Sequence, residues 1–181
     1  MVVIGAGGIG QSVIQAARLS SAGRIVAVDA NPTKERAARL MGATDFIDAS
    51  STTDPVAAVH DLGLPHGVDY VFECVGHPAL IRQAVDMLDW GGSCVILGVP
   101  KPGTEATFVV NTMYNDKAIM GCRYGSSKPH HDIPLIVDLY KSGRFMLDEM
   151  VTQVYGMADI NTALDDLGAG RLNRGVLDFA G

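Results

Sequence analysis

Three glycines near the start of the chain have the spacing of a phosphate-binding turn. Gly5, Gly7 and Gly10 follow the apolar run Val2–Ile4 and open a segment with helical character. The first glycine permits a tight turn, the second leaves space for a pyrophosphate beside the backbone, and the third lets the helix pack closely on a sheet. The helix N-terminus adds free N–H groups and a partial positive charge, both of which favour bound phosphate.

An acidic residue nineteen positions after the last of these glycines completes the pattern. Asp29 ends the apolar run at 24–29, so its carboxylate would lie at the tip of the second strand. There it can accept hydrogen bonds from both hydroxyls of an adenosine ribose. Because a carboxylate would repel a 2′-phosphate, the sequence predicts NAD as the cofactor in preference to NADP.

Other interpretations of the glycine pattern are open. A plain strand–helix turn uses glycine as well, and 21 glycines in the chain make chance spacing plausible. A methyltransferase also places an acid after its second strand, but its glycine strand usually carries an acidic residue, and here that strand is apolar. The strand, the helix and the acid together favour a dinucleotide site.

Composition limits the function classes. A chain of 181 residues suits one domain, or one domain with an appendage. A net charge of −6 without a Lys/Arg run argues against nucleic acid and anionic membranes as partners. The longest apolar stretch is far short of the ~20 residues that span a bilayer, and the chain begins directly with a buried-strand pattern rather than a signal peptide. Cys74, Cys94 and Cys122 are widely spaced, which is typical of reduced thiols. We therefore expect a soluble, cytoplasmic protein.

Apolar runs alternate with amphipathic segments, as in parallel βαβ units. The sequence predicts strands at 2–6, 25–29, 45–49, 69–74, 93–98 and 118–122, with helices at 8–20, 32–41, 55–62 and 77–89. Asn31–Pro32 and Asp54–Pro55 are typical helix starts, since each pairs a capping side chain with proline at the first helical position. The predicted fold class is therefore α/β, with a doubly wound, six-stranded parallel sheet (a Rossmann fold) in the order 3-2-1-4-5-6.

A further short strand is predicted at Thr107–Asn111. The edge of such a strand carries unpaired backbone groups, which either pair with a second subunit or are covered locally. After Gly125 the pattern changes to a helix, a strand, a helix and a strand, predicted at 129–142, 150–155, 157–168 and 174–179. We predict a dinucleotide-binding domain over 1–124 and a C-terminal segment over 125–181 that packs on something other than the six-stranded sheet.

Several segments, taken in order, resemble the C-terminal half of zinc-dependent, medium-chain alcohol dehydrogenases. They are Gly5–Gly10, Val28–Lys34, Arg39–Thr44, Asp69–Gly76, Leu97–Pro100, Gly121–Gly125, Ile160–Leu164 and Gly170–Leu177. The resemblance spans essentially the whole chain. Within the family, Asp138–Gly143 and the Leu147–Asp148 that follows it are most similar to the class that includes thiol-dependent formaldehyde dehydrogenases.

The resemblance implies contacts to the nicotinamide end of the cofactor. The residues concerned are Ile9, Leu97, Gly98, Val99, Cys122 and Tyr124. Ile9 would press on one face of the nicotinamide ring. Main-chain groups of Leu97, Cys122 and Tyr124 would hold the carboxamide, which fixes the face from which hydride leaves.

It also implies contacts to the rest of the dinucleotide. Gly8 belongs to the phosphate turn, and Lys34 would reach the adenosine ribose beside Asp29. Cys74 and Val75 would line the adenine–ribose side of the cleft, and Arg174 would pair with the pyrophosphate. A solvated helix charge is the plainer role for Lys34, and a surface position is the plainer one for Arg174.

In this family the zinc ligands precede the glycine loop, in a separate domain, and leave one coordination position open for substrate. The cysteines of this chain are isolated, and the adjacent His130 and His131 point about 100° apart on a helix. We therefore predict no catalytic and no metal-binding residue in the chain. The resemblance implies a fragment of an oxidoreductase, inactive alone, that binds NAD(H) for a small alcohol, or a thiol–aldehyde adduct, held with zinc by the missing domain.

Two alternatives stay open, and one partner is implied. A zinc-free quinone or enoyl reductase of the same superfamily usually prefers NADPH and lacks the acid, so Asp29 speaks against it. A freestanding NAD-binding module without catalysis differs from a fragment only in what lies upstream. By resemblance, the partner is a second copy of the chain, joined through Thr107–Asn111 in a homodimer.

Overall fold

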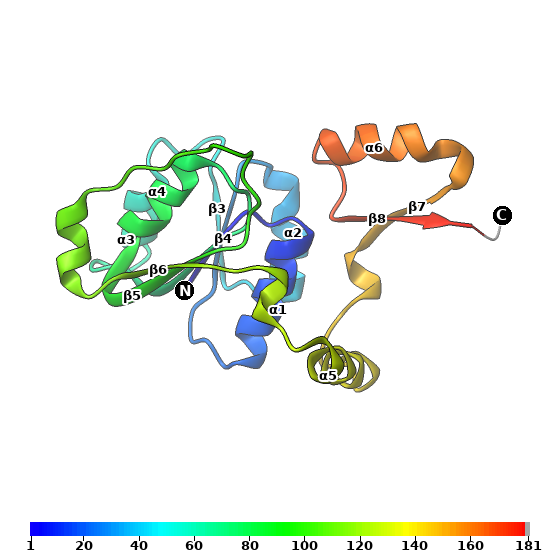
Figure 1. The fold of residues 1–181 in the computed structure, drawn as a ribbon, viewed down its shortest axis with the longest axis horizontal. Coiled ribbons are helices and arrows are strands. Elements are labelled where there is room, and N and C mark those ends of the chain that lie inside the picture. Colours follow the sequence, from blue (N-terminus) through cyan, green and yellow to red (C-terminus); the bar gives the residue numbers. More distant parts are fainter. Residues whose placement is uncertain (180–181) are drawn as a thin grey trace. The chain divides into compact units, whose positions relative to one another are not determined.

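The computed structural model describes residues 1–179. The chain separates into two compact units, Met1–Lys128 and the residues from Pro129 onward (Figure 1). The domain boundary after residue 124 stays a prediction.

The first unit is built on a six-stranded sheet in which neighbouring strands are parallel and follow the order β3-β2-β1-β4-β5-β6. The strands are β1 (Val2–Ile4), β2 (Val26–Asp29), β3 (Asp45–Asp48), β4 (Val68–Glu73), β5 (Leu88–Ile96) and β6 (Ala118–Gly121). The order reverses between β1 and β4, so a crevice opens beyond their carboxyl ends. The predicted α/β fold with a doubly wound parallel sheet is confirmed.

Helices cover both faces of this sheet. They are α1 (Gly8–Leu19), α2 (Glu35–Met41), α3 (Pro55–Asp61) and α4 (Pro78–Asp86). α1 contacts α2 and α3 contacts α4, and the two pairs lie on opposite faces (Figure 1). Because both faces are covered, β1 consists of buried residues throughout, as expected for a central parallel strand.

The two predicted helix starts are confirmed. The side chain of Asn31 accepts a hydrogen bond from the N–H of Thr33 at 3.1 Å and caps the short 3₁₀ helix η1 (Pro32–Lys34), which leads into α2. Asp54 accepts from the N–H groups of Val56 and Ala57, at 2.9 and 3.1 Å, and caps α3. Each cap satisfies backbone donors that have no partner inside the helix.

β5 begins earlier than the sequence predicted. It starts at Leu88 rather than at residue 93, and α4 ends at Asp86 rather than at residue 89. Leu88 is buried and pairs with Val68, with an irregularity in the register before Tyr70. Gly91 has a φ of +68°, a conformation open to glycine, and this lets one strand continue through the irregularity.

The extra strand predicted at Thr107–Asn111 is wrong. Residues 104–109 belong to no helix or strand, and the 3₁₀ helix η2 (Val110–Asn115) begins at Val110. The N–H and hydroxyl of Thr112 both donate to the carbonyl of Val109, at 3.0 and 2.8 Å. β-branched residues favour a strand only where a neighbouring strand completes the ladder, and the described chain supplies none here, so local turn bonds prevail.

The second unit is a single βαβ unit preceded by a helix. Its elements are α5 (Pro129–Lys141), β7 (Val151–Gly156), α6 (Ile160–Gly168) and β8 (Arg174–Asp178), and β7 pairs with β8 in parallel. Within its described residues, the buried apolar side chains are Met150, Tyr155 and Leu172. A core of this size is small for an independent domain.

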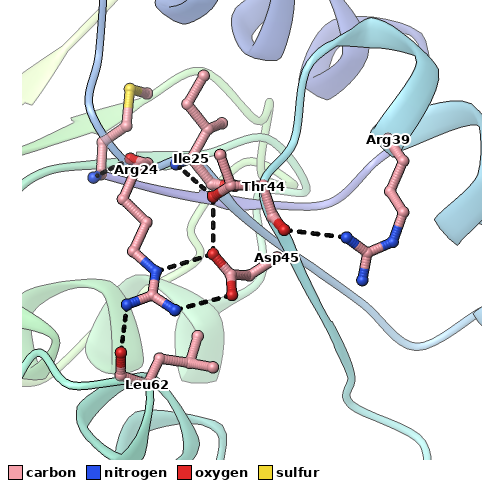
Figure 2. Close-up of polar contacts among 7 residues, drawn as sticks. Arg24, Ile25, Arg39, Thr44, Asp45 and Leu62 are labelled. Carbon is pink, nitrogen blue, oxygen red and sulfur yellow. Dashed lines mark hydrogen bonds and ion pairs between the residues drawn. The ribbon is translucent and has the colours of Figure 1, made fainter.

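A polar network ties β2 to β3 at the amino-terminal edge of the sheet (Figure 2). Arg24 donates to both carboxylate oxygens of Asp45, at 2.8 and 2.9 Å, and also to the carbonyl of Leu62. The hydroxyl of Thr44 accepts from the N–H of Ile25 at 3.0 Å and lies 2.7 Å from Asp45. The hydrogen bond from Arg24 is the main cause that lowers the pKa of Asp45 to about 2.

Asp45→Asn should lower the free energy of unfolding by about 1 kcal/mol at pH 7, because one bidentate, charge-assisted pair is lost and its partial exposure screens it. The folded pKa of about 2 is below the ordinary 3.8, so this stabilisation is complete above that value and disappears as pH falls from 3.8 towards 2. Urea denaturation between pH 7 and pH 2 measures the loss of stability at pH 7 and its disappearance at low pH. The control is Glu35→Gln, which removes an exposed pair with Arg39. Equal stability of the Asp45 variant and the wild type at pH 7 would contradict the prediction.

Candidate functional site

A cavity of about 230 Å³ lies where the carboxyl ends of β1, β2 and β4 meet. Its lining is mostly apolar and carries one carboxylate. The lining residues are Ile4, Gly5, Val28, Asp29, Ala30, Ala49, Val75, Leu80 and Gln83. Its position at the switch point of the strand order is where open α/β sheets bind ligands.

The glycine loop is shaped by two close approaches. The N–H of Gly5 donates to the carbonyl of Val28 at 2.8 Å, and Gly5 has a φ of +91°. A Cβ atom on Gly10 would lie 1.8 Å from the carbonyl oxygen of Gly5, so helix α1 can approach the strand only with glycine there. A Cβ atom on Gly7 would meet nothing within 4 Å, which leaves open space beside the backbone.

The amino-terminal end of α1 is free to bind an anion. Gly7 is the N-cap residue, Gly8 and Ile9 begin the helix, and no side chain caps it. The first N–H groups of a helix have no partner inside it, and together with the helix dipole they attract negative charge. Ile9 is half exposed although it is apolar.

Asp29 joins the glycine loop to the end of β2. One carboxylate oxygen accepts from the N–H of Ala6 at 2.7 Å, and the other accepts from the N–H of Asn31 at 2.8 Å. Each oxygen keeps further lone-pair capacity. The carboxylate is therefore held in one place at the cavity and can still accept hydroxyl groups from a ligand.

Lys34 lies beside this carboxylate and not in open solvent. Only 8% of the residue is exposed. Burial lowers the pKa of Lys34, and the negative charge of Asp29 acts in the opposite direction. Lys34 is thus a largely buried residue whose charge interacts with Asp29, and its predicted contact with the ribose stays a prediction.

Cys74 and Val75 follow β4 and border the crevice. Burial is the main cause that raises the pKa of the Cys74 thiol to about 12, with the charge of Glu73 adding to it. The same two causes raise the pKa of Cys94 to about 11. Thiols of such high pKa stay protonated and are poor nucleophiles and metal ligands.

The predicted nicotinamide contacts lie at the ends of β5 and β6. The N–H groups of Leu97 and Gly98 donate to the carbonyl of Glu73, at 2.8 and 2.9 Å, and the N–H of Cys122 donates to Ile96 at 3.2 Å. Of the main-chain groups of Leu97 and Cys122, the carbonyls are thus the ones left for a ligand. Val99, after β5, and Tyr124, in the 3₁₀ helix η3 (Tyr124–Ser126), are exposed.

Arg174 belongs to the second unit, where it is the first residue of β8 and is exposed. The predicted contact of its guanidinium with the pyrophosphate stays a prediction.

The described residues contain neither a metal-binding cluster nor a helix that could span a membrane. No group of three or more His, Cys, Asp or Glu side chains among residues 1–179 could hold a metal ion. His131 lies 2.9 Å from Asp132 at the exposed start of α5. In the same part of the chain, no helix combines the length and apolar character needed to cross a bilayer.

A larger cavity, of about 660 Å³, lies at the opposite edge of the sheet. Met1, Arg24 and Asp69 mark its position at the amino ends of β1, β2 and β4. Ligands of open α/β sheets bind at the carboxyl ends of strands. We therefore place the candidate site in the smaller cavity beside the glycine loop.

Sequence reasoning missed two kinds of residue at this site. Ala49, directly after β3, and Leu80 and Gln83, on α4, line the cavity, which only the packing of distant segments reveals. Gln11 is fully buried and donates to the carbonyl of Ala6 at 3.0 Å, while its Oε1 has no hydrogen-bond partner within residues 1–179. The sequence did contain a signal for Gln11, because an amide on the buried face of a helix needs a partner. Glu73, an acid at the end of an apolar strand, is a second buried polar residue with such a signal.

Gly10→Ala should lower the free energy of unfolding by about 3 kcal/mol, because the new methyl group overlaps the carbonyl of Gly5 and must push α1 away from β1. Gly7→Ala is the matched control in the same loop, and we expect a change below about 0.5 kcal/mol. Thermal unfolding followed by circular dichroism measures both. Equal losses in the two variants would mean that the close approach at Gly10 does not set the position of the helix.

The chain is similar to dehydrogenases along its whole length. The family model described as "Zinc-binding dehydrogenase" matches residues 8–142. The "Probable S-(hydroxymethyl)glutathione dehydrogenase 1" of Schizosaccharomyces pombe is 36% identical over an alignment of 181 positions, which covers 99% of this chain and 47% of that protein. The chain thus spans about half the length of the curated relatives it matches.

Solved structures agree with this similarity. Benzyl alcohol dehydrogenase from Acinetobacter calcoaceticus has a TM-score of 0.94 and 35% identity, over 99% of this chain and 49% of that one. A zinc-binding dehydrogenase-type structure from Sinorhizobium meliloti 1021, bound to NADP, has a TM-score of 0.81 and 28% identity, over 90% of this chain and 47% of that one. The resemblance to the C-terminal half of medium-chain alcohol dehydrogenases is confirmed, and the chain belongs to the zinc-binding dehydrogenase family.

Proposed function

We propose that the chain binds NAD(H) as the cofactor half of an alcohol dehydrogenase-like oxidoreductase. The observation that carries the proposal is the carboxylate of Asp29, which is fixed at the cavity of about 230 Å³ by the N–H of Ala6 at 2.7 Å. An uncapped helix start lies directly after that loop. One loop therefore combines an anion site for the pyrophosphate with an acceptor for the ribose.

The charges at the cavity support NAD over NADP. A 2′-phosphate would stand where Asp29 accepts ribose hydroxyls, and like charges at that distance repel. The buried ammonium group of Lys34 works against this repulsion, since it lies close enough to influence Asp29. A related structure is bound to NADP, so the fold by itself does not exclude that cofactor. We expect the preference to depend on the balance of these two side chains.

In the intact enzyme, we infer, the cofactor accepts or donates hydride at C4 of its nicotinamide ring, with a small alcohol or a thiol–aldehyde adduct as substrate. This half would bind the dinucleotide and orient the ring against Ile9 and the ends of β5 and β6. The described residues do not fit a zinc site. We therefore assign any zinc, the substrate pocket and the proton relay to the other half, and expect the chain alone to be inactive.

Two other functions are less favoured. A zinc-free quinone or enoyl reductase half would use the same fold, but the acid at the end of β2 disfavours the NADPH that such enzymes usually prefer. A freestanding NAD-binding module shares every feature of the cavity. The relatives are about twice as long as the chain, which favours a half-enzyme over a module. We place the protein in the cytoplasm, where its free thiols would stay reduced.

We also propose that two copies pair through the segment that follows β5. β6 is one of the two edge strands of the sheet, and three large apolar side chains in it or shortly before it are exposed: Val110, Tyr114 and Met120. An edge strand with exposed apolar neighbours is a natural site for association. We expect a second copy to cover these side chains and to pack on Thr107–Asn111.

Asp29→Asn should weaken NADH binding by about 1.5–3 kcal/mol, because charged hydrogen bonds to the ribose become neutral ones, and should leave NADPH binding unchanged or tighter. Asp48→Asn is the control. Asp48 pairs with Asp29 in the register of β2 and β3, so this substitution removes the same charge one strand away. Fluorescence titration with NADH and NADPH at fixed salt measures the ratio. A ratio that Asp29→Asn does not change would mean that Asp29 is not at the ribose.

Val110→Asp should convert a dimer to a monomer, because two buried carboxylates would face each other or lose their hydration at the interface. Leu40→Asp is the control, since Leu40 is also an exposed apolar residue but lies on α2. Sedimentation velocity of the wild type and both variants measures the effect. A wild-type chain that sediments as a monomer at every concentration would contradict the proposed pairing.

A further inference from the structure

Glu73, at the end of β4, is a fully buried carboxylate. It accepts from the N–H of Val75 at 2.9 Å and from the N–H of Gly76 at 2.9 and 3.0 Å, through its two oxygens. A buried carboxylate is costly unless hydrogen bonds satisfy it. These bonds join the carboxylate to the loop that directly follows its own strand.

That loop, residues 74–76, lies between the two other loops at the crevice. A Cβ atom on Gly5 would be 2.8 Å from Cγ2 of Val75, and one on Gly98 would be 2.0 Å from the nitrogen of Gly76. The loop therefore packs against the glycine turn on one side and against the end of β5 on the other. Val75 and Gly5 both line the cavity beside Asp29.

The main chain of Glu73 holds the β5 side of the same crevice. Its carbonyl accepts from the N–H groups of Leu97 and Gly98, at 2.8 and 2.9 Å. One residue thus fixes two loops at the carboxyl edge of the sheet, the first through its side chain and the second through its backbone. The side-chain bonds are the ones that a substitution can remove.

We propose that Glu73 is a positioning residue, which sets the affinity for the dinucleotide by holding the loop at 74–76 as a wall of the cavity. The inference rests on the proposed function, because it takes the cavity beside Asp29 as the dinucleotide site. A loop that is free to leave this position reduces the fraction of molecules competent to bind, and the apparent affinity falls by the same fraction. Glu73 acts through Val75 and Gly76, since it is itself buried away from the crevice.

Glu73→Leu keeps the volume but leaves two N–H groups without acceptors, and Glu73→Gln keeps one acceptor oxygen while turning an N–H₂ group towards Gly76. We expect NADH affinity to fall by about 100-fold in the first variant and by about fivefold in the second. Val59→Ala is the control. This substitution removes buried apolar volume from α3, and no residue of α3 lines the cavity beside Asp29. We therefore expect it to lower the free energy of unfolding and to leave the NADH affinity unchanged.

Three measurements on the full chain test the proposal: NADH titration by fluorescence, thermal unfolding, and amide hydrogen exchange of Val75 and Gly76. Faster exchange of both amides in Glu73→Leu, and mainly of Gly76 in Glu73→Gln, together with the expected losses of affinity, supports it. Affinity that matches the wild type within twofold in Glu73→Leu, despite faster exchange, overturns the positioning role and leaves the proposed function intact. A wild type that does not bind NADH, although Val75 and Gly76 are protected, overturns the proposed function and the inference with it. If Glu73→Leu does not fold, Glu73→Gln decides, and unchanged affinity and exchange there overturn the role.

Discussion

The carbonyl oxygen of Gly5 lies where a side chain on Gly10 would have to stand, 1.8 Å from an ideal Cβ position. Helix α1 can therefore begin directly on top of the turn that ends β1, with its first N–H groups beside the open space at Gly7. The turn also places the N–H of Ala6 against the carboxylate of Asp29. The uncapped start of α1, the position of the Asp29 carboxylate and the cavity beside it all depend on this one approach of backbone to backbone.

A second feature shared by the site is that its acids are held by main-chain N–H groups. Asp29 accepts from Ala6 and Asn31, and Glu73 accepts from Val75 and Gly76. Backbone donors are fixed by the fold, so both carboxylates have one defined position before any ligand arrives. Such preorganisation reduces the cost of ordering on binding. By contrast, Asp45 at the opposite edge is held by the guanidinium of Arg24 (Figure 2).

The second unit buries few of its apolar side chains. Apolar side chains on α5 and α6 are exposed, among them Ile133, Leu135, Leu164 and Leu167. A two-stranded sheet with one covering helix buries little apolar surface. The relatives contain about as much chain again as the part that matches, and we expect that additional chain to cover these side chains in the intact enzyme.

Local sequence was sufficient for the first unit's strand order, its helix caps and the placement of Asp29, because buried parallel strands, capping residues and glycine turns each have a short-range signature. The sequence also identified the family from motifs in order. It was wrong about Thr107–Asn111, since a strand needs a partner that the described chain does not supply, and it placed the start of β5 too late, since pairing with Val68 outweighs the helical pattern before it. Only the tertiary structure brought Ala49, Leu80 and Gln83 to the cavity beside Asp29. Contacts between segments distant in sequence depend on how helices and strands pack, and no local pattern encodes them.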